Sequence, residues 1–263
     1  MFPFLKATYL GLLRDRIFHG IAVVVAIFAL IPATSVLSMR QVGELGITLA
    51  LSVNSFLLLL VALFLGGTAL WKDIDRRFIH SALALPLSRS TYLLGKFCGV
   101  ALFLLAVATI LGGLVVTTIW FVTTADPTGR PLLWTNITLC LVFDALKYLV
   151  LVAGAFLFSA VSTSFFLPVF GTITLFLAGT ITQQVYDYLQ TPAAQSLSPT
   201  VRQIAKGIYY ALPNFTVFDL KANAIYSLPI AGTEILLALG YGLAYGGLLL
   251  SAAALLFNRR EFR

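Results

Sequence analysis

Charged residues are scarce in this sequence, and so are the side chains that carry most enzyme chemistry. Of the 263 residues, 10% are charged and 60% are hydrophobic, and the chain has two cysteines and two histidines. Soluble domains average roughly 25% charged and 45–50% apolar residues. A water-soluble fold could not bury this much apolar surface, so the composition indicates an integral membrane protein.

The sequence also has no motif for a catalytic centre, a metal or a nucleotide. HExxH and GxSxG are absent, and Gly95-Lys96 is followed by Phe97 and lacks the upstream glycine of a phosphate-binding loop. Cys98 and Cys140 are too far apart for a CxxC motif and fall in different predicted helices. We therefore expect no catalytic residue, no metal site and no bound cofactor, and we expect that the chain is not an enzyme by itself.

Long apolar stretches are what the sequence has instead. A spanning helix needs about 20 apolar residues. Six stretches of sufficient length are predicted, at about 17–38, 47–70, 97–123, 136–160, 164–182 and 233–257. The predicted fold is an all-α integral membrane protein, one transmembrane domain over residues 1–263 with six transmembrane helices. Residues 1–16 predict an N-terminal interfacial helix, with a continuation of the first span as the alternative.

The basic residues predict the orientation. Lys and Arg collect on the cytoplasmic side of short loops. With the N-terminus inside, eleven of the 17 basic residues fall on the cytoplasmic side, so both termini are predicted to be cytoplasmic in a multi-pass protein of the cytoplasmic (inner) membrane. The net charge is +7, but the basic residues flank apolar segments and form no basic stripe on a soluble face. No nucleic-acid partner is therefore expected.

The first of two long connections, residues 71–96, is predicted to hold a short amphipathic helix on the cytoplasmic side, ended by Pro86. One face is largely apolar and the opposite face is charged. The apolar face includes Ile74, Phe78 and Leu85, and the charged face includes Asp73, Arg76 and Arg77. The alternative is a helix that lies on the inner leaflet.

The second long connection, residues 183–232, predicts extracytoplasmic amphipathic helices. Ser198 and Pro199 are an N-cap and first-turn pair. The apolar stripe after them consists of Val201, Ile204, Ile208 and Leu212. A second helix is predicted between Pro213 and Pro229, and both helices are expected on the outer rim.

Three polar residues within the predicted spans are singled out as candidates: Asn54, Asp144 and Lys147. Asp144 and Lys147 are three residues apart in the fourth span, close to mid-bilayer depth, where opposite charges on one helical face can pair. They form either an ion pair that locks this helix to its neighbours or a polar element that lines a substrate route or a proton path. Asn54 in the second span has the same two interpretations.

Four glycines have the GxxxG spacing of close helix contacts, in the pairs Gly95/Gly99 and Gly242/Gly246. They predict helix or dimer packing, against the alternative of plain tolerance for small residues. The six spans show no internal duplication, which disfavours an inverted-repeat secondary transporter.

The chain resembles the ABC-2 type permeases, the transmembrane subunits of type V ATP-binding-cassette transporters. The architecture carries most of the resemblance. The local match is the stretch from Asp73 to Gly99, where a charged run is followed by Leu85-Pro86-Leu87-Ser88-Arg89 and then Tyr92-Leu93-Leu94-Gly95-Lys96. Leu212-Pro213-Asn214-Phe215 is similar to the proline-containing segment before the last helix of many members.

The resemblance implies a dimeric pore in which each chain rests a coupling helix in a groove of a separate cytoplasmic ATPase. ATP and Mg²⁺ would then be bound by that partner subunit. Ile74, Phe78 and Leu85 are the implied buried contacts, and the implied polar contacts are Asp73, Asp75, Arg76 and Arg77. Membrane lipid and an extracytoplasmic accessory protein are further expected partners. Three questions stay open: whether the chain forms a homodimer or pairs with a sister permease, which substrate is moved, and in which direction it is transported.

Two other functions are alternatives to such a permease. A membrane scaffold or assembly factor would keep the six spans and recruit partners through the two long connections. A secondary transporter would instead use protons, carried through Asp144.

Overall fold

The computed structural model describes residues 42–75, 88–125, 132–162, 164–192, 194 and 198–259. Within these ranges the chain is helical and has no strand. The predicted interfacial helix at 1–16 and the first predicted span at 17–38 lie outside the described residues.

Five helices are long and apolar enough to cross a membrane. The first is a composite of α4 (Val42–Val61), the π-helix η1 (Ala62–Gly66) and α5 (Gly67–Asp75). The others are α7 (Arg89–Ala125), α8 (Trp134–Val161), α9 (Phe166–Leu189) and α12 (Gly232–Arg259). Four of the predicted spans after the first lie within these helices, and the one at 164–182 begins two residues before α9, which makes the chain a multi-pass, all-α membrane protein.

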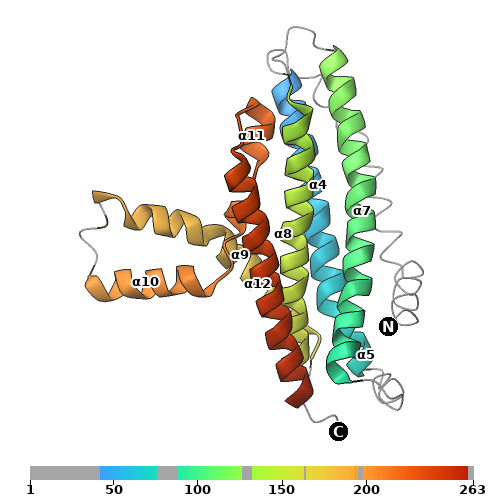
Figure 1. The fold of residues 1–263 in the computed structure, drawn as a ribbon, viewed down its shortest axis with the longest axis vertical. Helices are drawn as coiled ribbons and strands as arrows, with labels where there is room; N and C mark the ends of the chain where they lie inside the picture. Colours follow the sequence, from blue (N-terminus) through green and yellow to red (C-terminus); the bar gives the residue numbers. More distant parts are fainter. Residues whose placement is uncertain are drawn as a thin grey trace.

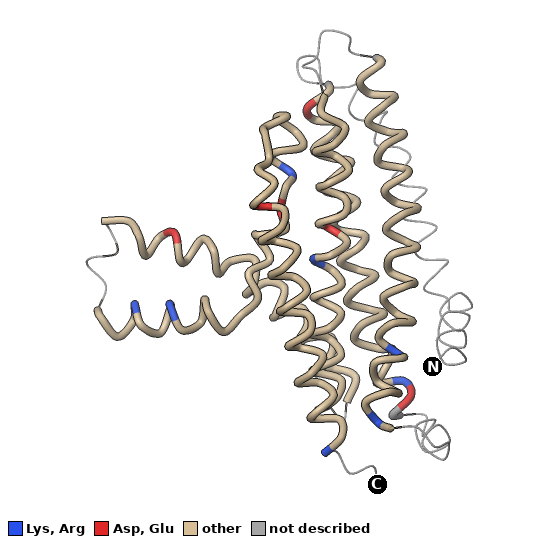
Figure 2. Tube along the Cα trace, viewed as in Figure 1, with Lys and Arg blue, Asp and Glu red and all other residues tan. Residues whose placement is uncertain are grey.

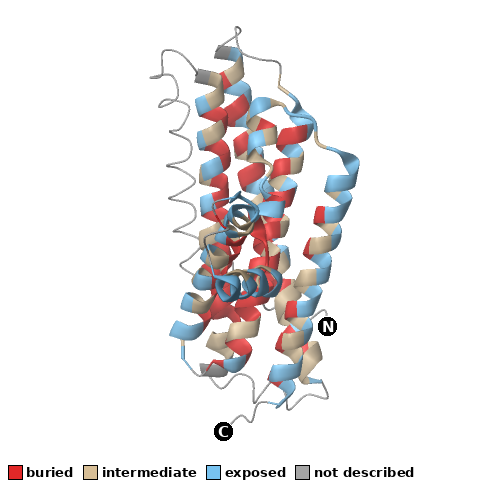
Figure 3. Ribbon diagram, turned by 90° about the vertical axis from the view of Figure 1, so that its left-hand side faces the viewer, coloured by how far each residue is buried: buried red, intermediate tan, exposed pale blue. Residues whose placement is uncertain are grey.

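Helix α8 is the centre of the bundle, and α4, α7, α9 and α12 pack against it (Figure 1). In its most apolar 18-residue stretch 67% is buried, compared with 17% for α12, so α8 is surrounded by the other helices while α12 lies at the surface of the bundle. Gly154 of α8 has no side chain, which lets the Leu175 side chain of α9 approach its backbone. Figure 3 shows the buried positions concentrated inside the bundle.

A π-turn interrupts the first long helix. Residues Ala62–Gly66 form η1, and the helix then continues as α5. Gly66 packs so closely that a Cβ at this position would lie 2.9 Å from Ala155 Cβ of α8. Ser159 Oγ of α8 donates a 3.4 Å hydrogen bond to the Gly67 carbonyl. The irregular turn is therefore held against α8 by a close backbone approach and by a polar contact.

Helix α10 (Pro199–Ala211) begins as predicted, because Ser198 Oγ accepts a hydrogen bond from Val201 N at 3.4 Å. It runs beside the end of α9, where the Tyr186 and Tyr209 rings stack at 4.3 Å. We call residues 180–189 of α9 together with α10 the arm. The arm projects sideways across the long axis of the bundle (Figures 1 and 3).

Helix α10 lies partway along the bundle in Figure 1, and its expected position on the outer rim stays a prediction. Helix α9 continues to Leu189, past the predicted end at 182, and α10 packs on this extension. After α10 the chain forms the 3₁₀ helix η3 (Phe215–Phe218) and α11 (Lys221–Tyr226). The second helix predicted between Pro213 and Pro229 is thus present as two short pieces, and α11 lies near one end of the bundle (Figure 1).

Charges gather where the helices end (Figure 2). The end of α5, the start of α7 and the end of α12 meet at one end of the bundle, where Arg89 Nη1 donates a 3.2 Å hydrogen bond to the Asn258 carbonyl. At the other end, Asn136 Nδ2 of α8 donates to the carbonyls of Asn223 and Leu228, at 3.0 and 2.8 Å. The two ends of the bundle are therefore each tied by polar contacts.

Candidate functional site

A buried polar cluster joins α4 to α8 in the interior of the bundle. Asn54 and Ser55 of α4 and Asp144 and Lys147 of α8 are each 6% exposed or less. Asp144 is ten residues from the start of α8, or about 15 Å at 1.5 Å per residue. The hydrocarbon core is about 30 Å thick, so the cluster lies well inside the membrane.

The Asp144 carboxylate receives hydrogen bonds from two residues of α4. Asn54 Nδ2 donates to Asp144 Oδ2 at 3.1 Å, and Ser55 Oγ donates to Asp144 Oδ1 at 2.9 Å. Ser55 Oγ is also 2.8 Å from the hydroxyl of Tyr148 on α8. A carboxylate without partners at this depth would carry a large desolvation cost, which these donors offset.

Lys147 does not form an ion pair with Asp144 among the residues that the structure describes. Its ammonium lies instead over two aromatic rings, 5.3 Å from the centroid of Tyr148 and 5.4 Å from that of Phe176 on α9. The direct pairing that the sequence allowed is thus replaced by other contacts. Asp144 bonds to α4, and Lys147 lies over the ring of Tyr148 on α8 and that of Phe176 on α9.

Asn54 has one polar atom without a partner in the described part of the chain. Its Oδ1 is buried, while its Nδ2 is committed to Asp144. Leaving a buried acceptor unpaired costs about 1–3 kcal/mol. The contact between α4 and α8 is therefore specific but incompletely satisfied, which favours a contact that can break and re-form.

A second polar site clamps the end of α5 to the first turns of α7. Lys96 Nζ lies 2.6 Å from Asp73 Oδ2, and the Tyr92 hydroxyl donates a 2.5 Å hydrogen bond to the same oxygen. We call Asp73, Tyr92 and Lys96 the clamp. Asp73 was expected at the rim of a contact with another subunit, but it is engaged within its own chain.

Only two of the other six predicted coupling residues lie among the described residues. Ile74 and Asp75 end α5. The remaining four, Arg76, Arg77, Phe78 and Leu85, lie outside the described residues. The clamp joins the two helices on either side of this segment.

The predicted glycine contacts differ from one another. A Cβ on Gly242 of α12 would lie 3.0 Å from Leu146 of α8, so the two helices approach closely there. A Cβ on Gly246 would be at an ordinary 3.8 Å from Val150, and one on Gly95 would meet nothing within 4 Å. Gly99 is buried in α7. Of Gly95, Gly242 and Gly246, Gly242 is the one at a close helix contact.

Sequence reasoning missed four members of these sites: Ser55, Tyr148, Tyr92 and Lys96. Ser55 directly follows Asn54, and Tyr148 is four residues after Asp144, on the same face of α8. Closeness to a polar residue already singled out was the available signal for these two. Tyr92 and Lys96 are four residues apart on α7, but neither had such a signal.

Neither a scan against protein-family models nor a search of the curated proteins finds a match to this sequence. Within the described ranges, no three His, Cys, Asp or Glu residues lie together as a metal-binding group. The buried cluster can hold a proton or orient a polar group, and the clamp can transmit force between helices. These two capacities are the chemical basis for a function.

Proposed function

We propose that the chain is the permease subunit of an ATP-driven transporter of the ABC-2 type, which moves a substrate across the cytoplasmic membrane with ATP hydrolysed by a separate subunit. Two copies of the chain would form the translocation path. ATP and Mg²⁺ would bind the cytoplasmic ATPase. Residues 74–85 would contact that ATPase, with Phe78 as the central apolar contact.

The clamp is the observation that supports this proposal most directly. Asp73 lies at the end of one long helix and Lys96 near the start of the next, so their ion pair fastens together the two helices that flank residues 76–87. A force on this segment would reach α5 and α7 as a unit and would not simply bend the connection. Such stiffness suits a lever between an ATPase and a membrane bundle.

The composite helix α4–η1–α5 connects the clamp to the buried cluster. Asp73 and Asn54 are 19 residues apart on it, about 28 Å along a helix. A tilt of this rod that starts at the clamp would strain the hydrogen bonds from Asn54 and Ser55 to Asp144. The cluster would then act as a latch between α4 and α8 that opens when the ATPase moves.

The test is association with, and control of, a cytoplasmic ATP-binding-cassette ATPase, which would be sought first among the genes that neighbour the gene for this chain. Phe78→Asp should abolish co-purification of the ATPase, because a carboxylate would be desolvated in an apolar contact. The matched control is Val201→Asp, on an exposed position of α10. It should leave co-purification unchanged, and retention of the ATPase by Phe78→Asp would overturn the proposal.

A second substitution tests the lever. Lys96→Met removes the ion pair of the clamp and keeps a side chain of similar length. The ATPase should stay bound, and the vanadate-sensitive ATP turnover of the reconstituted complex should fall severalfold. Unchanged turnover would contradict a role for the clamp, and no vanadate-sensitive activity at all would favour a membrane scaffold.

A proton-coupled secondary transporter is the second candidate, and the buried Asp144 is the observation that favours it. Such a transporter would take up its substrate without ATP when a pH gradient is imposed. Asp144→Asn should then abolish that uptake. Strict dependence on ATP would exclude this alternative.

A further inference from the structure

A pocket of about 310 Å³ opens beside the buried cluster, on a different face of α8. Its walls come from α8, from η3 and the residue before α11, and from the first turns of α12. Five of the apolar residues that line it are Phe143, Val217, Leu220, Ile235 and Leu237. Ligand sites of about 300–1,000 Å³ with mostly apolar walls and few polar groups are the usual form of small-molecule sites.

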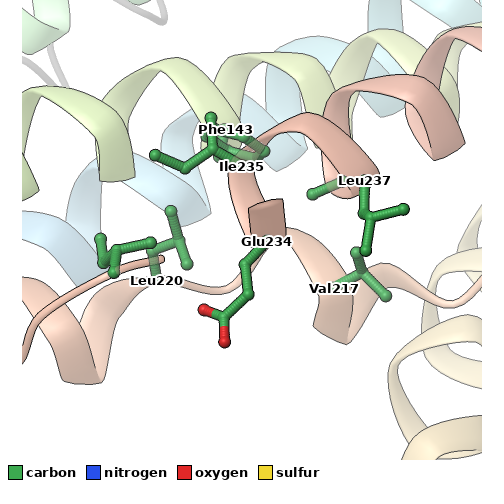
Figure 4. Close-up of a pocket in the computed structure, with 8 residues that line it drawn as sticks. Phe143, Val217, Leu220, Glu234, Ile235 and Leu237 are labelled. Carbon is green, nitrogen blue, oxygen red and sulfur yellow. The ribbon is translucent and has the colours of Figure 1, made fainter. Parts of the chain in front are cut away.

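Glu234 is the charged residue among those that line the pocket. Figure 4 shows it between Leu220 on one side and Val217 and Leu237 on the other, with its carboxylate pointing away from Phe143. Among the described residues, no Lys or Arg pairs with this carboxylate. The pocket therefore offers an apolar interior and one negative group at its edge.

The depth of the pocket in the membrane follows from the helices that build it. Glu234 is the third residue of the 28-residue helix α12. A helix of this length spans about 42 Å, more than the roughly 30 Å of the hydrocarbon core, so its first turn lies at headgroup level. Gly242 of α12 packs against Leu146 of α8, so Phe143 lies about five residues, or about 8 Å, deeper than Glu234. The starts of α8 and α12 share one end of the bundle, because Asn136 bonds to Leu228.

The open side of the pocket faces outward from the bundle. Leu237 is 73% exposed, and the adjacent Leu236 is 71% exposed, which is the pattern of a helix face in contact with lipid. An occupant would therefore enter from the bilayer. Its charged end would lie at headgroup level and its apolar part beside the hydrocarbon core.

We propose that this pocket binds a membrane lipid with a primary ammonium headgroup, of the phosphatidylethanolamine class. The ammonium donates a hydrogen bond to the Glu234 carboxylate, and one acyl chain lies against Phe143 and Ile235. A primary ammonium can make this charge-assisted hydrogen bond, whereas the quaternary ammonium of phosphatidylcholine has no hydrogen to donate. The proposal holds whether or not the chain is driven by ATP.

Photo-crosslinking in lipid nanodiscs tests the proposal. The probes are a phosphatidylethanolamine and a phosphatidylcholine that carry the same diazirine on one acyl chain, and mass spectrometry locates the labelled peptides. The ethanolamine probe should label the peptides that contain Phe143 and Leu220. Glu234→Gln should reduce this labelling about tenfold, because Gln keeps an acceptor for the ammonium but lacks the negative charge that strengthens the hydrogen bond.

Two further variants keep the result interpretable. Glu44→Gln changes another first-turn glutamate, at the start of α4, and should leave the labelling unchanged. Val217→Trp fills the pocket from a partly exposed position and should reduce labelling with Glu234 intact. Equal labelling by the two lipids, or labelling unaffected by both Glu234→Gln and Val217→Trp, would overturn the proposal. Displacement of the probe by free decylamine but not by unlabelled phosphatidylethanolamine would also overturn it, in favour of a soluble amine.

Discussion

Asp144 binds two side chains of α4 through separate oxygens, so its removal would leave Asn54 Nδ2 without this acceptor and Ser55 Oγ with the Tyr148 hydroxyl alone. In water such donors would be solvated, but Asn54 and Ser55 are 1% and 5% exposed. The cost of losing the acceptor is therefore set by burial and not by the number of bonds alone. This makes the pair Asn54 and Asp144 suitable for a double-mutant cycle.

We expect Asp144→Leu to lower the free energy of unfolding by about 1–3 kcal/mol, since it leaves a buried donor unsatisfied. Asn54→Leu combined with Asp144→Leu should cost less than the sum of the two single changes, by about 0.6–1.7 kcal/mol. Reversible unfolding in sodium dodecyl sulfate measures these values. Lys206→Leu, at an exposed position of the arm, is the control, and additive effects would mean that the two residues do not act together.

The residues of this cluster were visible in the sequence, but their partners were not. A charged or amide residue in an apolar run stands out by itself, which is why Asn54, Asp144 and Lys147 were singled out. The contact between Asn54 and Asp144 depends on α4 packing against α8, which the order of spans along the chain does not fix. The direction of Lys147 depends on the ring of Phe176 on α9.

At the scale of the elements, α9 is held at its midpoint by a glycine. A Cβ on Gly179 would collide with the carbonyl of Pro213 and would lie 2.6 Å from the ring of Phe215. Phe215 is 1% exposed, so its ring has little room to move. The arm therefore leaves the bundle at a point where η3 and its preceding residues pack directly on the α9 backbone.

Gly179→Ala should destabilise the protein by about 1–3 kcal/mol, the usual cost of overpacking a well-filled contact. Gly113→Ala in α7 is the matched control, because a Cβ there meets nothing within 4 Å. It should be neutral or slightly stabilising, since Ala favours a helix by up to about 1 kcal/mol relative to Gly. Thermal unfolding in detergent measures both, and equal effects would contradict the close packing at Gly179.

Local signals predicted where elements start better than where they end. The start of α10 is set by Ser198 and Pro199, two adjacent residues whose chemistry acts within one turn. The end of α9 is set by contacts with other parts of the chain. Gln183 Nε2 donates to Asp187 Oδ1 at 2.7 Å, and Tyr186 stacks on Tyr209, so a polar stretch that resembled a loop continues as a helix.

At the scale of the whole molecule, the apolar runs of the sequence predicted the helices of the bundle. No feature of the sequence predicted that the arm would project sideways. The length and hydrophobicity of a run determine whether it can cross a bilayer. The direction of a helix relative to its neighbours depends on tertiary contacts such as the stacked tyrosines of the arm. Such contacts cannot be predicted from the hydropathy of the sequence.

Six crossings require that both termini lie on the same side of the membrane, and the basic residues predict the cytoplasmic side. Green fluorescent protein fused before Met1 or after Arg263 should fluoresce in each case, and alkaline phosphatase at the same two positions should be inactive. Fluorescence at one terminus with phosphatase activity at the other would show an odd number of crossings. Phosphatase activity at both termini would reverse the predicted orientation.

The π-turn at Ala62–Gly66 makes one point of the first long helix tolerant of a change in length. A π-turn closes with i→i+5 hydrogen bonds and so contains one residue more than an α-helical turn. Loss of one codon in this turn would let it relax to an ordinary α-helix, and Asn54 and Asp73 would keep their faces. The same loss in α4 between Ser55 and the π-turn would instead rotate Asn54 and Ser55 by about 100° relative to Asp73 and separate the two polar sites.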